Sequence, residues 1–318
     1  MTKNTLKKLF IGGAIVLSAT IPAFGQQGQI KPEKKVVLRD PFVPPKNARY
    51  IMNQEQKIVK SLDELVSRLE KDGFDKNHIW AAYADKRFVI HREIIRYFDG
   101  SPETKGAKGT ISYDIYKENL GFKKKLNNAP GFMKRYKEEL ALAEKKYGVD
   151  KRYIVAILGV ESDFGDNKGH YLAFNALASM YTTRMKNFAY TELKEYLTMC
   201  KKNNKGLFDY TSSYAAALGP AQFIPSSFNR LFIDGNGDFV VDPFCMEDCI
   251  QSVAKYLKVG GWNSKANNKT PAEKSRNWEA IRSYNDSSFY VKAVIELATK
   301  AKWNAEDLKA VPQVIADF

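Results

Sequence analysis

The sequence has few of the residues that build metal centres and disulfide scaffolds, since only three Cys and three His occur in 318 residues. A His/Cys zinc centre, a di-iron bundle and a disulfide-stapled fold therefore do not fit it. Proline and glycine, at 12 and 20 residues, are too few for a collagen-like chain. The 44% hydrophobic content excludes a disordered chain, and the length allows one large domain or two ordinary ones.

Negative charge is the second shortage, because 36 Asp and Glu stand against 50 Lys and Arg, for a net charge of +14. Such an excess favours an anionic partner, and nucleic acid, a membrane surface and a cell-wall polymer all satisfy it. The basic residues are dispersed, however, and no nucleic-acid recognition motif occurs. We therefore expect no binding of nucleic acid.

Long hydrophobic runs are missing except near the N-terminus. There, three lysines precede an uncharged apolar run over 9–21. Ala23 and Gly25 then place small residues just before a cleavage site at Gln26. This layout predicts a signal peptide at 1–25, with an uncleaved membrane anchor as the alternative. No later stretch is apolar enough to cross a membrane, and no Cys lies near the cut to carry a lipid. We expect a periplasmic or secreted protein whose mature form has no transmembrane segment.

The cysteine number is odd, so at least one thiol is free or pairs between molecules. Cys245 and Cys249 are four residues apart, which is an unusual spacing for a bridge. We interpret these two and Cys200 as small buried hydrophobic residues.

The mature chain divides into a tether and one helical region. Residues 26–49 contain four prolines and little periodicity, which predicts an extended tether. Residues 50–318 have helical periodicity almost throughout, with one core from about 50 to 303. Short strands are predicted only at 36–38 and 239–241. The fold class is therefore mainly α, an α+β protein with few short strands, with helices predicted at 61–71, 91–98, 130–146, 151–160, 189–202, 247–259, 278–284 and 288–301.

One helix ends in a carboxylic acid. Residues 153–160 are apolar on every side, so this helix should be buried, with Asp150 as its N-cap. Glu161 follows directly, and desolvation there would raise its pKa and keep it protonated, as a general acid requires. The alternative is a glutamate that reaches solvent at a helix end. Asp163 and Asp166 are the second carboxylates of a two-carboxylate hydrolase, or else loop-capping and surface residues.

Two polar residues interrupt the mostly apolar segment 212–228. Ser213 and Gln222 need hydrogen-bond partners if they are buried, and a bound sugar could supply them. A purely structural role is the alternative for both.

An acidic loop follows at 234–248. Asp234, Asn236 and Asp238 stand at positions one, three and five, and the carbonyl of Val240 at seven, as in an EF-hand. Phe239 replaces the usual glycine at six, and the twelfth position is Cys instead of Glu. The pattern indicates a calcium loop, and a turn rich in Asp, Asn and Gly is the alternative.

Taken together, these segments resemble the B-type lytic murein transglycosylases, a lysozyme-like family acting on bacterial peptidoglycan. The matching segments occur in the family's order and span most of residues 50–300. They are YGV at 147–149, ILGVESDFG at 157–165, SYAAALGPAQFIPSSF at 213–228, DGNGD at 234–238, SVAKYL at 252–257, GW at 261–262 and AIRSYN at 280–285.

The resemblance implies a lysozyme-like core at about 130–303 and assigns roles to individual residues. Glu161 would be the single catalytic acid and base. The residues that would bind the substrate are Ser213 and Asn285 beside Glu161, Gln222, Tyr284 and Tyr290 in the sugar cleft, Tyr116 as a further cleft tyrosine, and Arg184 as a basic residue facing peptide or sugar. A structural Ca²⁺, not needed for the chemistry, would be held by Asp234, Asn236, Asp238, the Val240 carbonyl and Asp248.

The resemblance also implies the reaction: cleavage of the β-1,4 bond between N-acetylmuramic acid and N-acetylglucosamine, with 1,6-anhydromuramoyl products. A hydrolytic muramidase that uses Asp163, and an inactive peptidoglycan-binding scaffold, are the alternatives. The expected partner is the peptidoglycan glycan strand. We expect a monomer, which could associate with other cell-wall enzymes.

Overall fold

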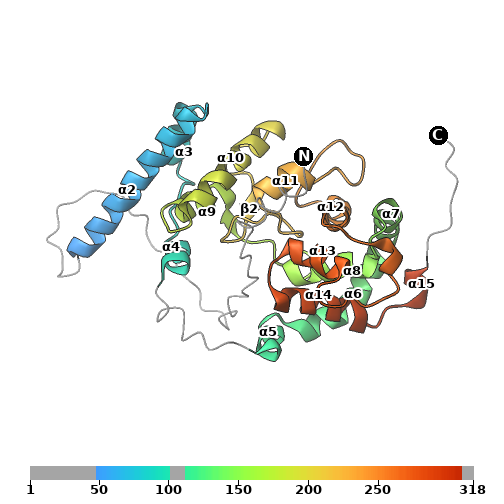
Figure 1. Cartoon of the computed structure of the whole chain (residues 1–318). Coiled ribbons are helices and arrows are strands. Elements are labelled where there is room, and N and C mark those ends of the chain that lie inside the picture. Colours follow the sequence, from blue (N-terminus) through green and yellow to red (C-terminus); the bar gives the residue numbers. More distant parts are fainter. Residues whose placement is uncertain (1–47, 101–111, 310–318) are drawn as a thin grey trace.

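The computed structural model describes residues 48–100 and 112–309 (Figure 1). The signal peptide predicted at 1–25, nearly all of the tether predicted at 26–49 and the strand predicted at 36–38 lie outside these residues. Fourteen α-helices and one 3-10 helix make up the described part, which confirms the mainly α class. They are α2 Ala48–Lys71, α3 Lys76–Ala84, α4 Arg92–Asp99, α5 Tyr113–Asn119, α6 Phe122–Arg135, α7 Lys137–Tyr147, α8 Lys151–Ser162, α9 Ala173–Tyr181, α10 Lys186–Lys202, α11 Pro225–Leu231, α12 Met246–Val259, η1 Ser264–Ala266, α13 Arg276–Tyr284, α14 Ser288–Lys300 and α15 Ala305–Leu308.

The strands lie where the sequence pattern did not place them. Within the described residues, β1 (Tyr171–Leu172) pairs antiparallel with β2 (Thr211–Ser212). The strand predicted at 239–241 is wrong, because that segment belongs to the acidic loop. Phe239 there has a φ of 66° and 96% of its surface exposed, so neither the backbone nor the side chain fits a half-buried strand.

Two helix boundaries differ from the sequence pattern by more than a few residues. Helix α2 begins at Ala48, inside the expected tether, and not at Ser61, whose hydroxyl donates to the Lys57 carbonyl within the continuing helix. The helix predicted over 130–146 is two helices, since α6 ends at Arg135 and Tyr136 leaves helical geometry with φ −112° and ψ 35°.

Helix α8 is the central element. Each of its residues except Arg152 is buried, which confirms the prediction that this helix lies inside the fold. It packs against α6, α7, α12 and α14. A methyl group added at Gly159 would lie 2.7 Å from the Phe164 ring, so the chain packs closely here. Asp150 caps α8 as predicted, accepting a hydrogen bond from the Arg152 N–H.

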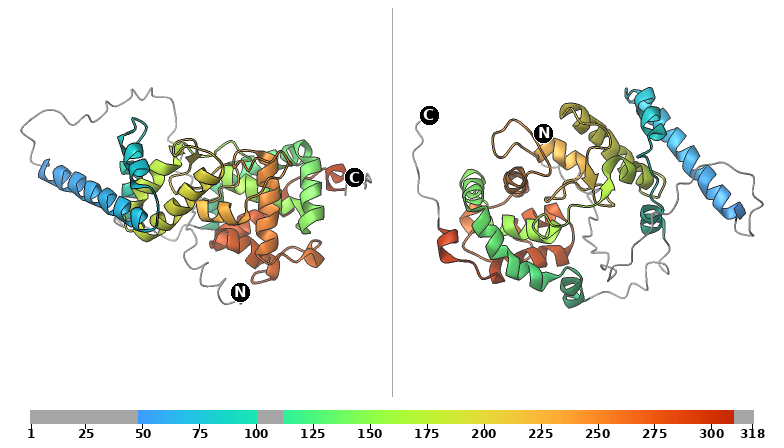
Figure 2. Two further views of the ribbon diagram at one scale, coloured as in Figure 1. Left: turned by 90° about the horizontal axis from the view of Figure 1, so that it is seen from above. Right: turned by 180° about the vertical axis from the view of Figure 1, so that it is seen from behind.

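The N-terminal helices form the far end of the molecule. Figures 1 and 2 show α2 and α3 at one end, with α7 and α15 at the opposite end. Helices α2 and α4 pack against α9, and α9 packs against α10. The Tyr190 hydroxyl donates to the Arg68 carbonyl, and the Arg68 guanidinium lies 3.8 Å from the Tyr190 ring centroid. These contacts join α2 to α10.

Candidate active site

Glu161 occupies the last turn of α8, and a tight left-handed turn follows it. Asp163 caps the helix with φ 54°, and Phe164 and Gly165 continue with φ 63° and 94°. The Ser162 hydroxyl donates to the Leu158 carbonyl and accepts from the Gly165 N–H. Left-handed geometry costs about 1–2 kcal/mol for each non-glycine residue. The turn therefore depends on surrounding contacts to hold it.

The Glu161 carboxyl group is buried, with 8% of the residue exposed. Its Oε1 accepts a hydrogen bond of 2.7 Å from the Tyr290 hydroxyl, while Oε2 has no hydrogen-bond partner among the described residues. Burial raises the pKa of Glu161 to about 8, against the opposing effects of the Tyr290 hydrogen bond and the Lys125 charge. At neutral pH this carboxyl group is thus mostly protonated, as a general acid must be.

Tyrosines from α12, α13 and α14 lie near the carboxyl group. The Tyr284 hydroxyl donates to the Ala221 carbonyl at 2.5 Å, and its ring lies 4.6 Å from that of Tyr256. Burial, with the nearby Glu161 carboxylate as the next cause, raises the pKa of both Tyr284 and Tyr290 well above the usual value. These phenols therefore remain neutral hydrogen-bond donors.

The structure distributes the other predicted residues unevenly. Tyr116 is buried in α5, its ring 5.7 Å from that of Phe289, and it is close enough to Tyr290 to affect the pKa of that phenol. Asn285 is buried directly after α13. Arg184 is exposed in the connection between α9 and α10, and its Nε donates to the carbonyl of Phe98, near the end of α4, at 2.6 Å. Tyr116 is joined to the Glu161 cluster, whereas Arg184 is tied to the N-terminal helices.

Ser213 and Gln222 belong to a compact loop that finds partners within itself. The Ser213 hydroxyl accepts from the Ala217 N–H at 3.1 Å. The Gln222 amide donates to the Gly219 carbonyl at 2.8 Å, with Gln222 itself at φ 51°. Both side chains thus have protein partners before any sugar binds, and the loop contacts the site where Ala221 accepts the Tyr284 hydroxyl.

Sequence reasoning missed Lys125 of α6. Only 5% of it is exposed, and its Nζ lies 3.5 Å from Asp163 Oδ1. Lys124 donates to Asp163 Oδ2 at 2.5 Å and approaches the exposed Asp166 at 3.8 Å. Burial raises the pKa of Asp163, but the two lysines outweigh it and leave that pKa below its usual value. A run of three lysines is typical of a solvated helix face, so nothing in the sequence marked one of them as buried.

The acidic loop is closed by hydrogen bonds to its own backbone. The Asp234 carboxylate accepts two N–H bonds from within the loop, one of them from Phe239. Asp248, at the start of α12, accepts from the Gly235 and Asp242 N–H groups. The loop therefore brings the first and last of the predicted ligands onto one short stretch of backbone.

The donor chemistry of this loop fits a hard cation, since it offers carboxylate, amide and carbonyl oxygens. Each carboxylate oxygen that accepts one N–H bond keeps a lone pair for a cation. Even so, no group of three His, Cys, Asp or Glu in the described part of the chain is arranged to hold a metal ion. Calcium binding by Asp234, Asn236, Asp238, Val240 and Asp248 stays a prediction.

The three cysteines are free thiols, and Cys200 and Cys249 are buried, as interpreted from the sequence. Cys245 is only partly buried, because it stands at the N-cap of α12, where its thiol donates to Glu247 at 3.1 Å.

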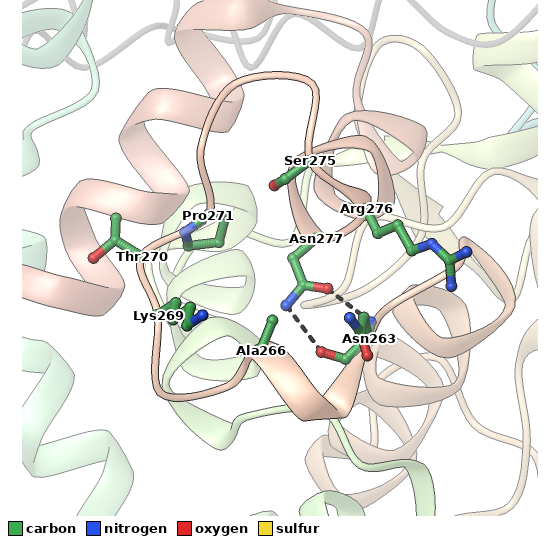
Figure 3. A pocket seen from close by; sticks show the side chains of 8 residues that line it. All are labelled: Asn263, Ala266, Lys269, Thr270, Pro271, Ser275, Arg276 and Asn277. Atoms are coloured by element: carbon green, nitrogen blue, oxygen red, sulfur yellow. Dashed lines mark hydrogen bonds between the residues drawn. The ribbon is translucent and has the colours of Figure 1, made fainter.

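A surface pocket lies apart from Glu161, in the connection that precedes α13 (Figure 3). The Asn277 amide closes it by bonding both the N–H and the carbonyl of Asn263. Its lining residues are Asn263, Ala266, Lys269, Thr270, Pro271, Ser275, Arg276 and Asn277.

Over residues 48–100 and 112–309, no helix has the length and apolarity needed to cross a membrane.

Comparison with known proteins identifies the family. A family model described as Transglycosylase SLT domain matches residues 57–276, more than half of the chain. The chain belongs to the B-type lytic transglycosylase family. This confirms the resemblance read from the sequence, and the lysozyme-like, mainly α fold of the family agrees with the observed helices.

Individual relatives are distant in sequence. The chain is 28% identical to the membrane-bound lytic murein transglycosylase B of Escherichia coli (strain K12) over 208 residues, which is 63% of this chain and 56% of that protein. The alignment thus spans little more than half of that relative.

Solved structures are similar over more of their length. The soluble lytic transglycosylase SltB1 of Pseudomonas aeruginosa superposes with a TM-score of 0.65 at 25% identity, covering 76% of this chain and 97% of that chain. The lytic transglycosylase Slt35 of Escherichia coli, in complex with calcium, superposes with a TM-score of 0.63 at 22% identity, covering 77% and 92%. At 22% identity, the similarity to Slt35 shows a shared fold alone.

Proposed function

We propose that this protein is a lytic transglycosylase that cleaves the β-1,4 bond between N-acetylmuramic acid and N-acetylglucosamine in peptidoglycan. The observation that carries the proposal is the buried Glu161 carboxyl group, whose pKa is raised to about 8. Membership in the lytic transglycosylase family and similarity to SltB1 support the same reaction class. The proposed products carry 1,6-anhydromuramoyl ends.

In the first step, protonated Glu161 donates its proton to the glycosidic oxygen as the bond to C1 breaks. Oε1 is engaged by Tyr290, which leaves Oε2 as the oxygen without a protein partner and hence the one to face the substrate. An oxocarbenium-like centre develops at C1 of the muramoyl ring. The acetamido oxygen of that sugar supports the centre, so no enzyme nucleophile is needed.

In the second step, ionised Glu161 accepts the proton of the C6 hydroxyl of the same sugar, and that oxygen attacks C1. The anhydro ring forms without consuming water. An intramolecular hydroxyl held near C1 has a very high effective concentration, which lets it compete with water. The Tyr290 hydrogen bond stabilises the carboxylate between the two steps.

The remaining site residues position the sugars. Ser213 and Asn285 would orient the acetamido group, Gln222 and Tyr284 would line the cleft, and Tyr116 would support Tyr290 through α5. Arg184, which is exposed and bonded to the Phe98 carbonyl of α4, would face an anionic part of the polymer.

A hydrolytic muramidase is the alternative that the sequence left open. It would need Asp163 or Asp166 as a free second carboxylate. Asp163 is instead engaged by Lys124 and Lys125, and the Asp166 side chain, which is 73% exposed, lies 3.8 Å from the Lys124 ammonium group. These pairings favour the single-carboxylate reaction.

The deciding experiment is mass spectrometry of muropeptides released from purified sacculi. Wild type should release 1,6-anhydromuramoyl products, and Glu161→Gln should lose about 10²–10⁴-fold in rate because it cannot donate a proton. Asp166→Asn is the matched control and should retain wild-type products and rate. Ordinary reducing muramic acid from wild type would instead indicate hydrolysis, and full activity of Glu161→Gln would refute the catalytic assignment.

We also propose that the 234–248 loop binds Ca²⁺ as a structural ion. The oxygen donors of the loop support this, and the related fold of Slt35 was solved with calcium. Added Ca²⁺ should raise the melting temperature of wild type, and Asp234→Asn with Asp248→Asn should abolish that rise while sparing activity on sacculi. An equal rise in the double variant would place the ion elsewhere.

The proposed location is the periplasm or the exterior, with removal of residues 1–25 as the export step. The net charge of +14 suits an anionic wall polymer. Mass measurement of the mature protein after expression in a host with a secretion pathway should give Gln26 as the first residue. Retention of residues 1–25 would indicate the anchor alternative.

A further inference from the structure

An ion pair between a buried lysine and a partly buried aspartate lies at the C-terminal end of α8. Lys125 of α6 is 5% exposed, and its ammonium group is 3.5 Å from Asp163 Oδ1. Asp163 is the left-handed cap of α8, two residues after Glu161. A buried lysine loses hydration and is retained only where a partner compensates it. The proposed reaction gives this pair no role, although Lys125 is near enough to Glu161 to influence its ionisation.

The titratable groups that interact with Glu161 come from α6, α12, α13 and α14. Tyr290 of α14 is the hydrogen-bond donor, and Tyr284 of α13 and Tyr256 of α12 are neutral phenols. Its own helix ends in Asp163. Lys125 is therefore the buried positive charge of this cluster, because Lys124 on the same helix is largely exposed to solvent.

We propose that Lys125 and Asp163 form a positioning pair, which clamps the left-handed turn after Glu161 and places a positive charge where it stabilises the ionised form of Glu161. The inference rests on the function proposed for Glu161. It assigns a distinct role to each member of the pair: Asp163 anchors the lysine, and the lysine acts on the catalytic group.

The reaction explains why such a charge is useful. Glu161 must give up its proton in the first step and exist as a carboxylate before the second. Burial alone would disfavour that carboxylate too strongly, and a nearby ammonium group lowers the cost of forming it. Because Lys125 is buried, solvent screens its effect less than that of a surface lysine.

The test is a direct titration of the Glu161 carboxyl group by ¹³C NMR of protein labelled in glutamate, with the signal assigned by its loss in Glu161→Gln. Lys125→Met should raise the pKa of Glu161 by about one unit, a tenfold change in its acid constant. Lys125→Arg, which keeps the charge, should titrate like wild type. Lys124→Met is the matched control and should shift the pKa by much less.

A second comparison keeps the proposal testable where Lys125→Met does not fold. The Glu161 carboxyl group should have a lower pKa in Asp163→Asn than in the double variant Asp163→Asn with Lys125→Met. Both variants lack Asp163, so they differ only in the lysine. The double variant contains no unpaired buried charge from this pair. Equal titration of these two variants, or an unshifted Lys125→Met, would overturn the proposal.

Activity measurements distinguish the role of the Lys125–Asp163 pair from the function proposed for Glu161. The alkaline limb of the pH profile of kcat/KM on sacculi should move upward in Lys125→Met by the same amount as the NMR titration. If Glu161→Gln kept full activity, the proposed function would fail while the titration still tested the pair. If Glu161→Gln were inactive and Lys125→Met had the wild-type profile, only the positioning role would fail.

Discussion

The carboxyl groups of two acidic regions of this chain have opposite environments. Glu161 is enclosed by side chains from α6, α12, α13 and α14, which are distant in sequence. The carboxylates of the 234–248 loop are bonded by N–H groups of their own loop and its junction with α12. The first arrangement raises the pKa of the carboxyl group, and the second supplies its oxygens with hydrogen bonds. Burial with a single hydroxyl donor, on Oε1, leaves Glu161 a proton donor, whereas several backbone N–H donors favour the ionised form of the loop carboxylates and stabilise the turn.

The same contrast appears in the backbone. Both regions contain a phenylalanine with positive φ, Phe164 after the catalytic glutamate and Phe239 in the loop. The Phe164 ring packs 5.3 Å from the Phe132 ring of α6 and occupies the space that a side chain at Gly159 would need. Phe239 is 96% exposed. The backbone strain at Phe164 is therefore offset by packing of its ring, whereas the ring of Phe239 makes no such packing contacts.

The largest expected effect concerns stability at the buried site. The pKa of Glu161 is about 8 in the folded protein against 4.5 for the free side chain, so the unfolded chain loses this proton first as pH rises. Wild type should lose stability from about pH 4.5 to about pH 8, and Glu161→Gln should not, giving a difference on the order of a few kcal/mol above pH 8. Urea unfolding at about pH 4 and about pH 9 measures it. Parallel pH dependence of the two proteins would contradict the enclosed-acid picture.

The next effect tests close packing beside the site. Gly159→Ala should destabilise the protein by about 1–3 kcal/mol, because its methyl group would lie 2.7 Å from the Phe164 ring. Gly131→Ala in α6 is the matched control, since nothing lies within 4 Å of its added methyl group, and it should stabilise by about 0.5–1 kcal/mol. Thermal unfolding of both variants gives the comparison, and a neutral Gly159→Ala would mean that Phe164 moves freely.

The smallest effect belongs to the loop. Phe239→Gly removes an exposed ring from a left-handed position, so relief of strain and the added freedom of the unfolded chain nearly cancel, within about 1 kcal/mol. Activity on sacculi should not change. A loss of several kcal/mol on chemical denaturation would show that Phe239 packs against something, and the contrast with Phe164 would disappear.

Sequence patterns succeeded where one element carries the information. The all-round apolar character of 153–160 predicts a buried helix, and Asp150 predicts its cap; both are confirmed. Patterns failed at 61–71 and 130–146, where Ser61 lies inside a longer helix and Tyr136 interrupts the expected one. The start of a helix depends on the residues that precede it, and a break depends on the packing of the helices on either side.

The sequence alone determined that this chain is a mainly α member of its family and that a carboxyl group stands at the end of its most apolar helix, because periodicity and motif order are properties of neighbouring residues. Only the tertiary structure decided that Tyr290 binds Glu161 and that Lys125, in place of the exposed Lys124, is buried against Asp163. The hydrogen bond joins residues 129 positions apart, and the ion pair joins α6 to the end of α8 across the intervening α7. Those distances are fixed by how the helices pack, and no local pattern records them.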